Sequence, residues 1–597
     1  MNSEVTVRTL SVRREESKEI KSLRDLVETS AELYGDKILY IYKRGEARHS
    51  FSYADYRRDL YRLGEGMSRI GLMGRTVAVI GDSCPEYMTA YVAAVSGGGV
   101  IVPLDRDLGH DEIARFADLS GAEAIFYTEQ FNDVLPALAA QMPQVRYFIP
   151  IVPAADNADD GAADAADAAD AADAAADIAG DGRVLPYSEL LSMGDKAIEE
   201  GDRSFLDYDC TADMSHMSAL LFTSGTTGTS KGVMLSHANL VASVNAACRG
   251  TIFGPDNTFV DLLPMHHSYE ITCCHFGASN LGGTVYINDS LKNTLRSITT
   301  FKPDSLIVVP LYVETMHKRI WAEIARKGMT KRVRALMKAS SAMRRAGIDI
   351  RRKLFKQILD GLGGNLRYII CGGAPLSPEL VRDFDAFGVE ICEGYGITEC
   401  SPLIAVNRHG RVRLRSVGQP VDNCEVRIAD PSADGTGEIE ARGRNVMLGY
   451  YGNDEATAEV FTEDGWFRTG DVGYIDADGY IYITGRKKNI IILSNGKNIF
   501  PEEIEEHLYT SPLIGECVVI GRKNSAGETR ITAVIYPSDE APELKGKSDE
   551  EKLVLIREAV NGINRSLPVY KQVRDVELRS EEFEKTTTRK IKRFLVK

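Results

Sequence analysis

The segment Thr223-Ser-Gly-Thr-Thr-Gly-Thr-Ser-Lys-Gly232 lies between two short apolar runs. Gly225 and Gly228 allow backbone conformations that are closed to other residues, and they can turn successive N–H groups toward an anion. Lys231 adds a mobile positive charge. Hydroxyl donors are supplied by Ser224, Thr226, Thr227, Thr229 and Ser230. The pattern predicts a loop that binds a polyphosphate, with the buried strand 218–222 leading into it.

This loop differs from the phosphate loop G-x-x-x-x-G-K-[ST]. Ser230 stands where that pattern requires glycine, and Gly232 stands where it requires a hydroxyl residue. The flanks differ too, because 233–235 reads as a second strand and the helix begins only after Ser236, its expected N-cap. A Ser/Thr-rich hairpin without a ligand is the alternative, but such a hairpin needs neither a buried lead-in strand nor a lysine.

The bulk composition limits the class of protein. The chain has 597 residues, of which 44% are hydrophobic, so it can form more than one domain with a large core. The 71 basic and 86 acidic residues give a net charge of −15, which disfavours a nucleic-acid partner. Ten scattered cysteines and an N-terminus without a signal-peptide pattern indicate a reducing cytoplasm. Glycines and Pro103 interrupt the uncharged stretch 87–104, so we expect helix, turn and buried strand there rather than a membrane span.

The order of segments indicates an α/β fold. Helical patterns alternate with β-branched runs, and ligands collect at the carboxyl ends of strands in open α/β sheets. The expected strands are 76–80, 99–103, 218–222, 305–309, 366–371 and 389–392. Ala-Ala-Asp triplets at about 154–182 read as a solvated surface insertion. We expect a large domain of mixed, helix-covered sheets over 1–486 and a small, mobile α+β domain over 487–597.

In its motifs the chain resembles the superfamily of AMP-forming acyl-CoA synthetases, adenylation domains of peptide synthetases and luciferases. The segment 223–232 is similar to the signature phosphate loop of that superfamily, except that Ser230 replaces the usual proline. The resemblance extends from about residue 22 to 597, apart from the triplet insertion. It implies that Thr226 and Lys231 are catalytic. It also implies that the loop binds ATP through Thr223, Ser224, Gly225, Thr227 and Gly228.

Two further motifs, Gly372-Gly-Ala-Pro375 and Glu393-Gly-Tyr-Gly-Ile-Thr-Glu399, follow predicted strands and can wall one crevice. Tyr395 offers a ring face for a purine, Thr398 a hydroxyl for the α-phosphate, and Glu399 a hard oxygen ligand for Mg²⁺. The resemblance implies the same roles, and it makes Glu399 catalytic through the metal. The other nucleotide-binding positions in these motifs are Gly373, Ala374, Pro375, Glu393, Gly394 and Gly396.

A third motif, Trp466-Phe-Arg-Thr-Gly-Asp471, precedes a Tyr-rich hairpin. Asp471 follows a glycine turn and can accept hydrogen bonds from two vicinal ribose hydroxyls. The resemblance implies this role for Asp471, a second ribose contact for Arg486, and a hinge between the two domains at Lys488. The segment Pro501-Glu-Glu-Ile-Glu505 is a good helix start and resembles the part that swings into the active site for thioester formation.

The basic C-terminal tail contains Lys590 within Glu584-Lys-Thr-Thr-Thr-Arg-Lys-Ile-Lys-Arg593. The resemblance implies that Lys590 is the adenylation lysine, whose charge stabilises the negative charge that develops between the carboxylate and the α-phosphate. Arg589 replaces the usual glycine. Lys585 and Lys592 therefore stay open as alternatives, as does a tail without catalytic function.

The segment Leu263-Pro-Met-His-His-Ser-Tyr-Glu270 resembles the long-chain fatty-acid branch of the superfamily. In that branch a histidine at the position of His267 borders the carboxylate site, so His267 is a catalytic candidate. The pair His266-His267 and the run Cys273-Cys-His275 lack the usual spacing of zinc ligands. We expect core or gate histidines here, and Mg²⁺ at Glu399 as the metal.

The region 314–360 is rich in bases and also resembles long-chain relatives. Apolar Val333, Leu336 and Met337 fall at helical spacing beside those bases. The bases are Lys331, Arg332, Arg334, Lys338, Arg344, Arg345, Arg351, Arg352 and Lys353. A basic amphipathic helix can rest on an anionic membrane, where fatty acids collect. A solvated basic face explains the same composition, so both interpretations stay open.

The resemblance implies an enzyme that uses ATP, Mg²⁺ and coenzyme A to activate a carboxylic acid, with a long-chain fatty acid as the expected substrate. The carboxylate attacks the α-phosphate with loss of pyrophosphate, and a thiol then attacks the mixed anhydride. The rivals are a ligase for a carrier protein, for an aryl acid or for an amino acid, and a nucleotide-binding relative without catalysis. We expect a cytoplasmic protein, with contact on the inner face of the membrane as an open alternative.

Overall fold

The structure is a computed structural model that describes most of the chain. The described residues are 6–7, 18–44, 47–151, 182–223, 230–249, 251–288, 293–493, 498–524, 528–585 and 591–596. The Ala-Ala-Asp triplets therefore lie outside the described residues.

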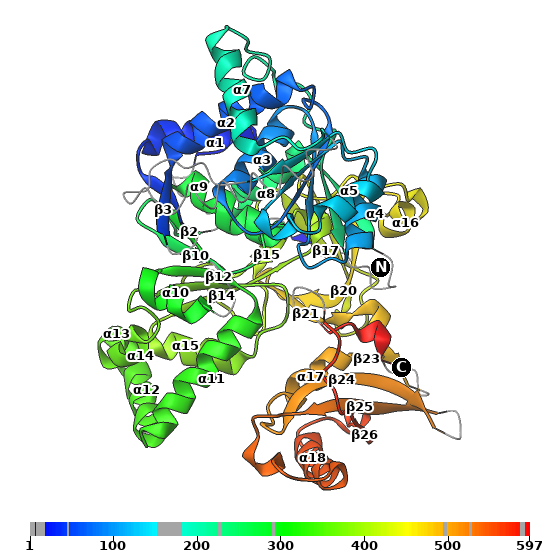
Figure 1. Cartoon of the computed structure of the whole chain (residues 1–597). Helices are drawn as coiled ribbons and strands as arrows, with labels where there is room; N and C mark the ends of the chain where they lie inside the picture. The colour runs from blue at the N-terminus through cyan, green and yellow to red at the C-terminus, as the bar shows by residue number, and fades with distance from the viewer. Residues whose placement is uncertain are drawn as a thin grey trace.

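A seven-stranded sheet carries the phosphate-loop hairpin (Figure 1). Its strands, in spatial order, are β19 (Gly449–Tyr450), β9 (Lys231–Ser236), β8 (Met217–Thr223), β5 (Val100–Leu104), β4 (Thr76–Ile80), β6 (Ala124–Tyr127) and β7 (Tyr147–Pro150). Along β4, Val77 and Val79 enter one core while Ala78 and Ile80 enter another, because successive side chains point to opposite faces. Helices therefore cover both faces, as is usual for sheets whose central strands are parallel. The predicted α/β class is confirmed.

Helices on the two faces of this sheet are α3 (Pro85–Ser96) on one side and α4 (His110–Ser120) with α5 (Leu135–Gln141) on the other. The stretch 87–104 thus folds as α3, a turn and β5, as predicted. Among the described residues, no helix has the length and apolar composition that crossing a membrane requires.

A nine-stranded sheet lies beside the first. Its strands, in spatial order, are β16 (Gln419–Pro420), β15 (Leu403–Val406), β14 (Glu390–Gly396), β13 (Tyr368–Cys371), β12 (Ser305–Val308), β10 (Thr258–Asp261), β11 (Thr284–Ile287), β2 (Ile38–Arg44) and β3 (Ala47–Ser52). One face packs on α8 (His237–Arg249), the π-helix η3 (Glu270–Phe276) and α9 (Gly277–Leu281). The helices of the other face, with their neighbours, are α10 (Thr294–Phe301), α11 (Pro310–Arg326), α12 (Thr330–Arg345), α13 (Arg351–Leu354), α14 (Lys356–Asp360) and α15 (Pro378–Phe387).

The remaining elements of the large N-terminal part complete its core and one wall of the site. The helices are α1 (Leu23–Tyr34), α2 (Tyr53–Arg69), α7 (Tyr187–Glu199) and α16 (Asp454–Val460). A five-stranded antiparallel sheet contains β1 (Thr6–Val7), β17 (Cys424–Ala429), β18 (Gly437–Gly443), β20 (Phe467–Ile475) and β21 (Ile481–Arg486). The strands β20 and β21 present Asp471 opposite Arg486.

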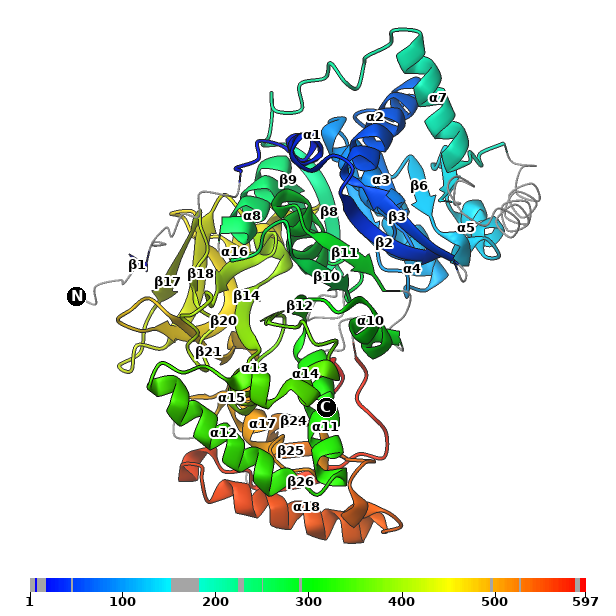
Figure 2. The same cartoon turned by 90° about the vertical axis from the view of Figure 1, so that its left-hand side faces the viewer.

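Residues after Arg486 form sheets and a core of their own. The strands are β22 (Ile491–Ile492) with β23 (Asn498–Ile499), and β24 (Ile514–Lys523), β25 (Thr529–Pro537) and β26 (Asp575–Leu578). They pack with α17 (Pro501–Leu508) and α18 (Asp549–Asn564). In Figures 1 and 2 this α+β unit and the α11–α15 helices form two neighbouring lobes. An ion pair of 3.7 Å between Lys318 Nζ and Glu540 Oε2 links them.

Candidate active site

The phosphate-loop hairpin closes at Thr223 and Lys231, which are paired across β8 and β9. The second strand is therefore present as predicted, and α8 follows it directly. Ser236 caps α8, because its Oγ accepts from the Asn239 N–H at 3.1 Å while Asn239 Oδ1 accepts from the Ser236 N–H at 2.8 Å. The predicted residues Ser224, Gly225, Thr226, Thr227 and Gly228 lie outside the described residues.

Lys231 and Glu399 meet at the ring of Tyr450. The Lys231 Nζ lies 4.4 Å from the ring centroid, and the Tyr450 hydroxyl donates to Glu399 Oε1 at 2.9 Å. Tyr450 reaches this place because β19 pairs with β9, and Glu399 stands in a short turn with Thr398 directly after β14. Burial and the nearby Glu399 raise the pKa of Tyr450, so it stays a neutral donor. A cationic lysine and a carboxylate oxygen thus lie at the base of the predicted phosphate site.

Tyr395, Asp471 and Arg486 form one hydrogen-bonded group. Asp471 Oδ2 accepts from the Tyr395 hydroxyl at 2.7 Å, and its Oδ1 lies 2.7 Å from Arg486 Nε. Asp471 is 5% exposed and Tyr395 is 7% exposed. A carboxylate has about four lone-pair sites, so Asp471 keeps acceptor capacity for further donors. The structure thus joins the predicted purine platform to the two predicted ribose contacts.

The motifs Gly372–Pro375 and Glu393–Glu399 leave the same sheet edge, because parallel β13 and β14 pair Cys371 with Glu393. Gly373 has a φ of +87°, which favours glycine, and a Cβ on Gly396 would lie 1.8 Å from the Pro402 carbonyl oxygen. Of the predicted positions, Gly373, Gly394 and Gly396 line the cavity described below. The others, Ala374, Pro375, Glu393 and Thr398, lie within two residues of them in the chain.

Glu393 faces the C-terminal unit. It is 6% exposed, and burial together with Glu506 of α17 raises its pKa to about 8. Glu506 also lies 3.5 Å from Arg415 of the large part. Two carboxyl groups from the two units thus oppose each other at this crevice, where ionisation of both would repel.

Lys488 stands in the short turn that directly follows β21. Burial and the adjacent Arg486 lower the pKa of Lys488 to about 8, and the tail residue Arg593 acts in the same direction. Lys488 therefore lies where the chain passes from the five-stranded sheet to the C-terminal unit.

Lys590 lies outside the described residues, but both of its flanks are tied down. Lys585 is paired with Glu516 and with Glu582, and Lys585 forms a β-bridge with Ile591. Further along, Arg593 pairs with Glu505 of α17. Lys585 is thus engaged in ion pairs on the C-terminal unit, which weakens it as the alternative adenylation lysine.

An apolar cavity begins at this crevice and runs beneath the nine-stranded sheet. It encloses about 1090 Å³ of atom-free space, including its mouth. The sheet side contributes every second residue of two strands, as expected for one face. These are Tyr368 and Ile370 of β13, with Gly372 directly after it, and Cys392, Gly394 and Gly396 of β14, where Tyr395 lines the cavity as well. The helical side contributes residues four apart, namely Tyr269, Cys273, Gly277 and Leu281.

His267 lies in the turn two residues before Tyr269, which lines the cavity. Its ring centroid lies 4.0 Å from that of His266. Burial lowers the pKa of His266 to about 3, so that ring stays neutral beside Asp105, 3.5 Å away. The cavity itself has no sequence signature, because its lining comes from five or more separate segments.

Comparison with known proteins shows to which family the chain is similar. The AMP-binding enzyme family model matches residues 27–451, and the model of the AMP-binding enzyme C-terminal domain matches residues 488–596. Peroxisomal long chain acyl-CoA synthetase 6 of Arabidopsis thaliana is 30% identical over 556 residues, which cover 88% of this chain and 74% of that protein. Feruloyl-CoA synthase of an Amycolatopsis species is 30% identical over 500 residues, which cover 82% of this chain and 84% of that protein.

A similar solved structure is that of the anthranilate CoA ligase AuaEII in complex with anthranoyl-AMP. It superposes with a TM-score of 0.73 and 18% identity over 97% of both chains. At this identity the similarity shows the shared fold alone.

Proposed function

Because this chain belongs to the AMP-binding enzyme family, we propose that it is an acid–thiol ligase that converts a long-chain fatty acid to its acyl-adenylate and then to its coenzyme A thioester. The observation that carries this proposal is the apolar cavity that begins between Gly372 and Tyr395. Apolar walls favour an alkyl chain.

In the proposed first step, a carboxylate oxygen attacks the α-phosphorus of ATP, and the bond to the β-phosphate oxygen breaks to release pyrophosphate. Lys231 and the hairpin hold the phosphates, and Thr398 contacts the α-phosphate. Asp471 and Arg486 hold the ribose while Tyr395 and Gly373 flank the base. Glu399 would hold Mg²⁺, which supplies positive charge to the phosphates when bound, and the hard carboxylate oxygens of Glu399 suit that ion.

In the proposed second step, the sulfur of coenzyme A attacks the acyl carbon and AMP leaves. Neither step uses a protein nucleophile, so catalysis rests on positioning and on charge stabilisation. We propose that residues 487–597 rotate about Lys488 between the steps, so that Lys590 serves the first and a thiol channel the second. This rotation assumes that residues 1–486 and residues 487–597 are two separate domains.

The experiment is a measurement of pyrophosphate release with a panel of acids, with and without coenzyme A. The proposal predicts release with long-chain acids and thioester only with coenzyme A. Preference for aryl acids would instead indicate an aryl-acid ligase, like the relative named feruloyl-CoA synthase. Release without thioester would indicate a carrier-protein acceptor, and no release with any acid would contradict catalysis.

The cavity gives a sharper prediction for acid length. A Cβ on Gly277 would meet only the Thr272 carbonyl oxygen, at 3.5 Å, and Gly277 lines the cavity, so a larger residue there should narrow it. We expect Gly277→Leu to lower kcat/KM for long-chain acids by about 10- to 200-fold while short acids are spared. The matched control is Gly562→Leu, an exposed helix position in α18 with nothing within 4 Å. Equal loss for short and long acids would contradict an acyl role for the cavity.

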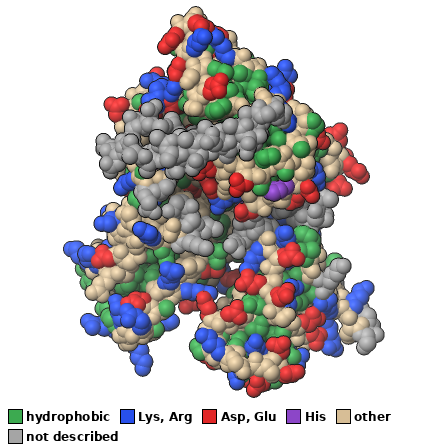
Figure 3. Space-filling model, viewed as in Figure 1, with side chains coloured by type: hydrophobic (Ala, Val, Ile, Leu, Met, Phe, Trp, Pro, Cys, Tyr) green, Lys and Arg blue, Asp and Glu red, His purple; other side chains and the backbone are tan. Residues whose placement is uncertain are grey.

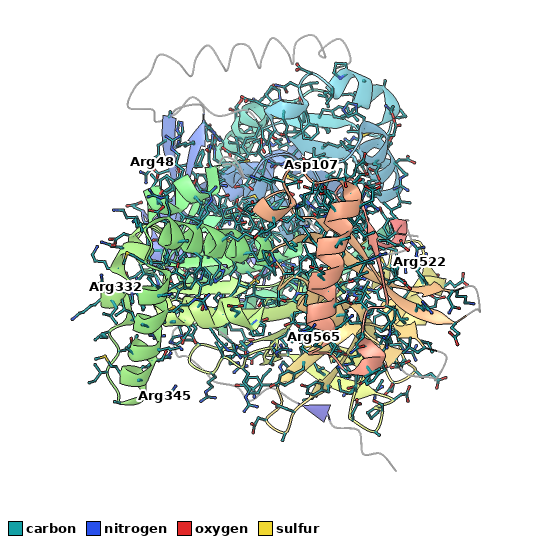
Figure 4. The ribbon with its side chains drawn as sticks, turned by 90° about the horizontal axis from the view of Figure 1, so that it is seen from below. Arg48, Asp107, Arg332, Arg345, Arg522 and Arg565 are labelled. Carbon is teal, nitrogen blue, oxygen red and sulfur yellow. The ribbon has the colours of Figure 1, made fainter. Side chains whose placement is uncertain are left out.

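The helices α12 and α13 form a basic lobe, and its apolar residues do not face outward as they would in a helix that lays an apolar face on a membrane. Val333, Leu336 and Met337 pack inward against Trp321 and Phe355 rather than facing outward. The bases instead cover the outside, where Figure 3 shows Lys and Arg side chains gathered and Figure 4 shows Arg332 and Arg345 pointing away from the protein. The exposed bases are Lys331, Arg332, Arg334, Lys338, Arg344, Arg345 and Lys353, of which Arg334 stacks on Trp321 and Arg344 pairs with Asp385. Met343 and Ile348 are also exposed beside them.

We propose that this lobe rests on an anionic membrane, which makes the protein a cytoplasmic one with peripheral contact on the inner face. Each base near such a surface contributes about 1 kcal/mol. Reversing Lys331, Arg332, Lys338 and Arg345 to Glu should therefore abolish co-sedimentation with phosphatidylglycerol vesicles. The control reverses four exposed bases of the C-terminal unit, namely Lys523, Lys545, Lys547 and Arg565. Binding that ignores anionic lipid, or that the control abolishes equally, would contradict the proposal.

A further inference from the structure

Behind the wall of the acyl cavity, three metal-ligating side chains meet in the core, and a fourth lies beside one of them. Glu270, Cys274 and His275 of η3 offer ligand atoms that all lie within 4.8 Å of one another. Asp261, the last residue of β10, adds an Oδ2 that lies 3.7 Å from His275 Nε2. Glu270 and His275 are fully buried, Cys274 equally so, and Asp261 is 3% exposed.

The π-helical backbone explains why these residues converge. Its hydrogen bonds run from residue i to i+5, so a turn is wider than in an α-helix. Glu270, Cys274 and His275 then share one face, which points at the end of β10. Tyr269 and Cys273 take the opposite face and line the acyl cavity. The two faces of one short helix thus serve two different environments, and π-helical turns are frequent at functional sites.

Several polar atoms of the cluster have no hydrogen-bond partner among the residues that the structure describes. They include Asp261 Oδ1 and both ring nitrogens of His275. A buried unsatisfied polar group costs about 1–3 kcal/mol, and an unpaired buried charge costs more. Such groups in a native core require a proton, a water or an ion to satisfy them. Burial and the neighbouring Asp261 raise the pKa of Glu270, so a shared proton is the competing explanation.

We propose that Asp261, Glu270, Cys274 and His275 bind one zinc ion. A thiolate, an imidazole and carboxylate oxygens are all zinc ligands, and four of them complete the tetrahedral coordination that zinc prefers. The mixed sulfur, nitrogen and oxygen donors disfavour Mg²⁺ and Ca²⁺, which prefer oxygen. A divalent cation would also reverse the effect of burial by favouring the ionised carboxylates.

The place of the site gives the zinc a structural role. Its ligands stand on both sides of the segment 262–269, which carries His267 and Tyr269. One ion would therefore join the end of β10 to η3 and hold that segment against the acyl cavity. The ion would not contact substrate. Because its ligands are buried, it would be taken up as the chain folds.

The test is elemental analysis of the full-length protein after expression in zinc-supplemented medium and dialysis into buffer without metal. We expect about one zinc ion per chain, and we expect protein made with cobalt to show thiolate-to-cobalt charge-transfer absorption. Less than about one tenth of an ion per chain would overturn the proposal and favour the shared proton. This measurement uses the wild type, so it stands even if a ligand variant does not fold.

The adjacent cysteines provide a matched pair of variants. Cys274→Ser should lower the zinc content about tenfold or more and remove the cobalt absorption, whereas Cys273→Ser should leave both unchanged. Cys273 faces the cavity and Cys274 faces the cluster. The two substitutions are therefore chemically identical but remove a sulfur from different sides of η3. Equal zinc content in both variants would place the metal elsewhere and overturn the assignment. These readouts do not depend on ligase activity, so failure of the proposed function would not affect them.

Discussion

Lys590→Ala is expected to lower carboxylate-dependent pyrophosphate exchange by about 10²- to 10³-fold, since removing one donor or charge at a reacting oxyanion has that effect. The negative charge that develops between the carboxylate and the α-phosphate would lose its cation. The measurement is exchange of labelled pyrophosphate into ATP at saturating fatty acid. Thioester formation from preformed acyl-adenylate should stay close to the wild-type rate, because the lysine serves only the first step.

Neighbouring lysines provide the controls for that experiment. Lys585 is held by Glu516 and Glu582, so Lys585→Ala should retain exchange within a few-fold of wild type. Lys592→Ala should do the same. Normal exchange in Lys590→Ala, or loss of exchange in one of the controls instead, would assign the adenylation step to another residue.

Asp471→Asn is expected to lower kcat/KM for ATP by about 10²-fold. The amide keeps the size of the side chain but removes the charge that pairs with Arg486 and the second acceptor that Tyr395 or a ribose hydroxyl uses. Breaking a fully buried ionic pair costs about 3–5 kcal/mol, and the cost here is smaller because 37% of the Arg486 side chain is exposed. Part of that cost appears as lost nucleotide binding. The KM for the fatty acid should change far less than the KM for ATP.

The matched control is Asp476→Asn, at the end of the same hairpin. Asp476 pairs with Arg413 at 2.6 Å and lies in the turn rather than at the crevice. Its loss should lower thermal stability without changing the KM for ATP. If Asp476→Asn raised that KM as strongly as Asp471→Asn, the effect would come from the hairpin as a whole and the ribose role would be wrong.

Local patterns predicted the parts of the site that are contiguous in the chain. The run 76–80 is β-branched and bounded by turns, and β4 has those same limits. The position of Gly373 was implied by the resemblance, and the structure gives it a φ of +87°, which suits glycine. Asp471 could be predicted because it follows a glycine turn. The pairing of Asp471 with Arg486 follows from the register of one hairpin, which short-range sequence determines.

The sequence alone could not predict contacts between residues that lie far apart in the chain. Tyr450 lies far along the chain from Lys231, and only the pairing of β19 with β9 brings its ring to the lysine. The run Cys273-Cys-His275 lacks the sequence spacing of zinc ligands. The proposed zinc cluster could not be predicted because it depends on the π-helical turn and on Asp261 of another element. On α12 the apolar residues pack against Phe355, because the neighbouring helices offer them a core that sequence periodicity cannot reveal.

The most direct test of the account is a crystal structure with a non-hydrolysable long-chain acyl-adenylate analogue. The account predicts the adenine beside Tyr395 and Gly373, the ribose hydroxyls on Asp471, and the acyl chain between Ile370 and Cys273. Density for the nucleotide away from the 223–231 hairpin and the Asp471–Arg486 pair, or an acyl chain outside the cavity, would contradict it.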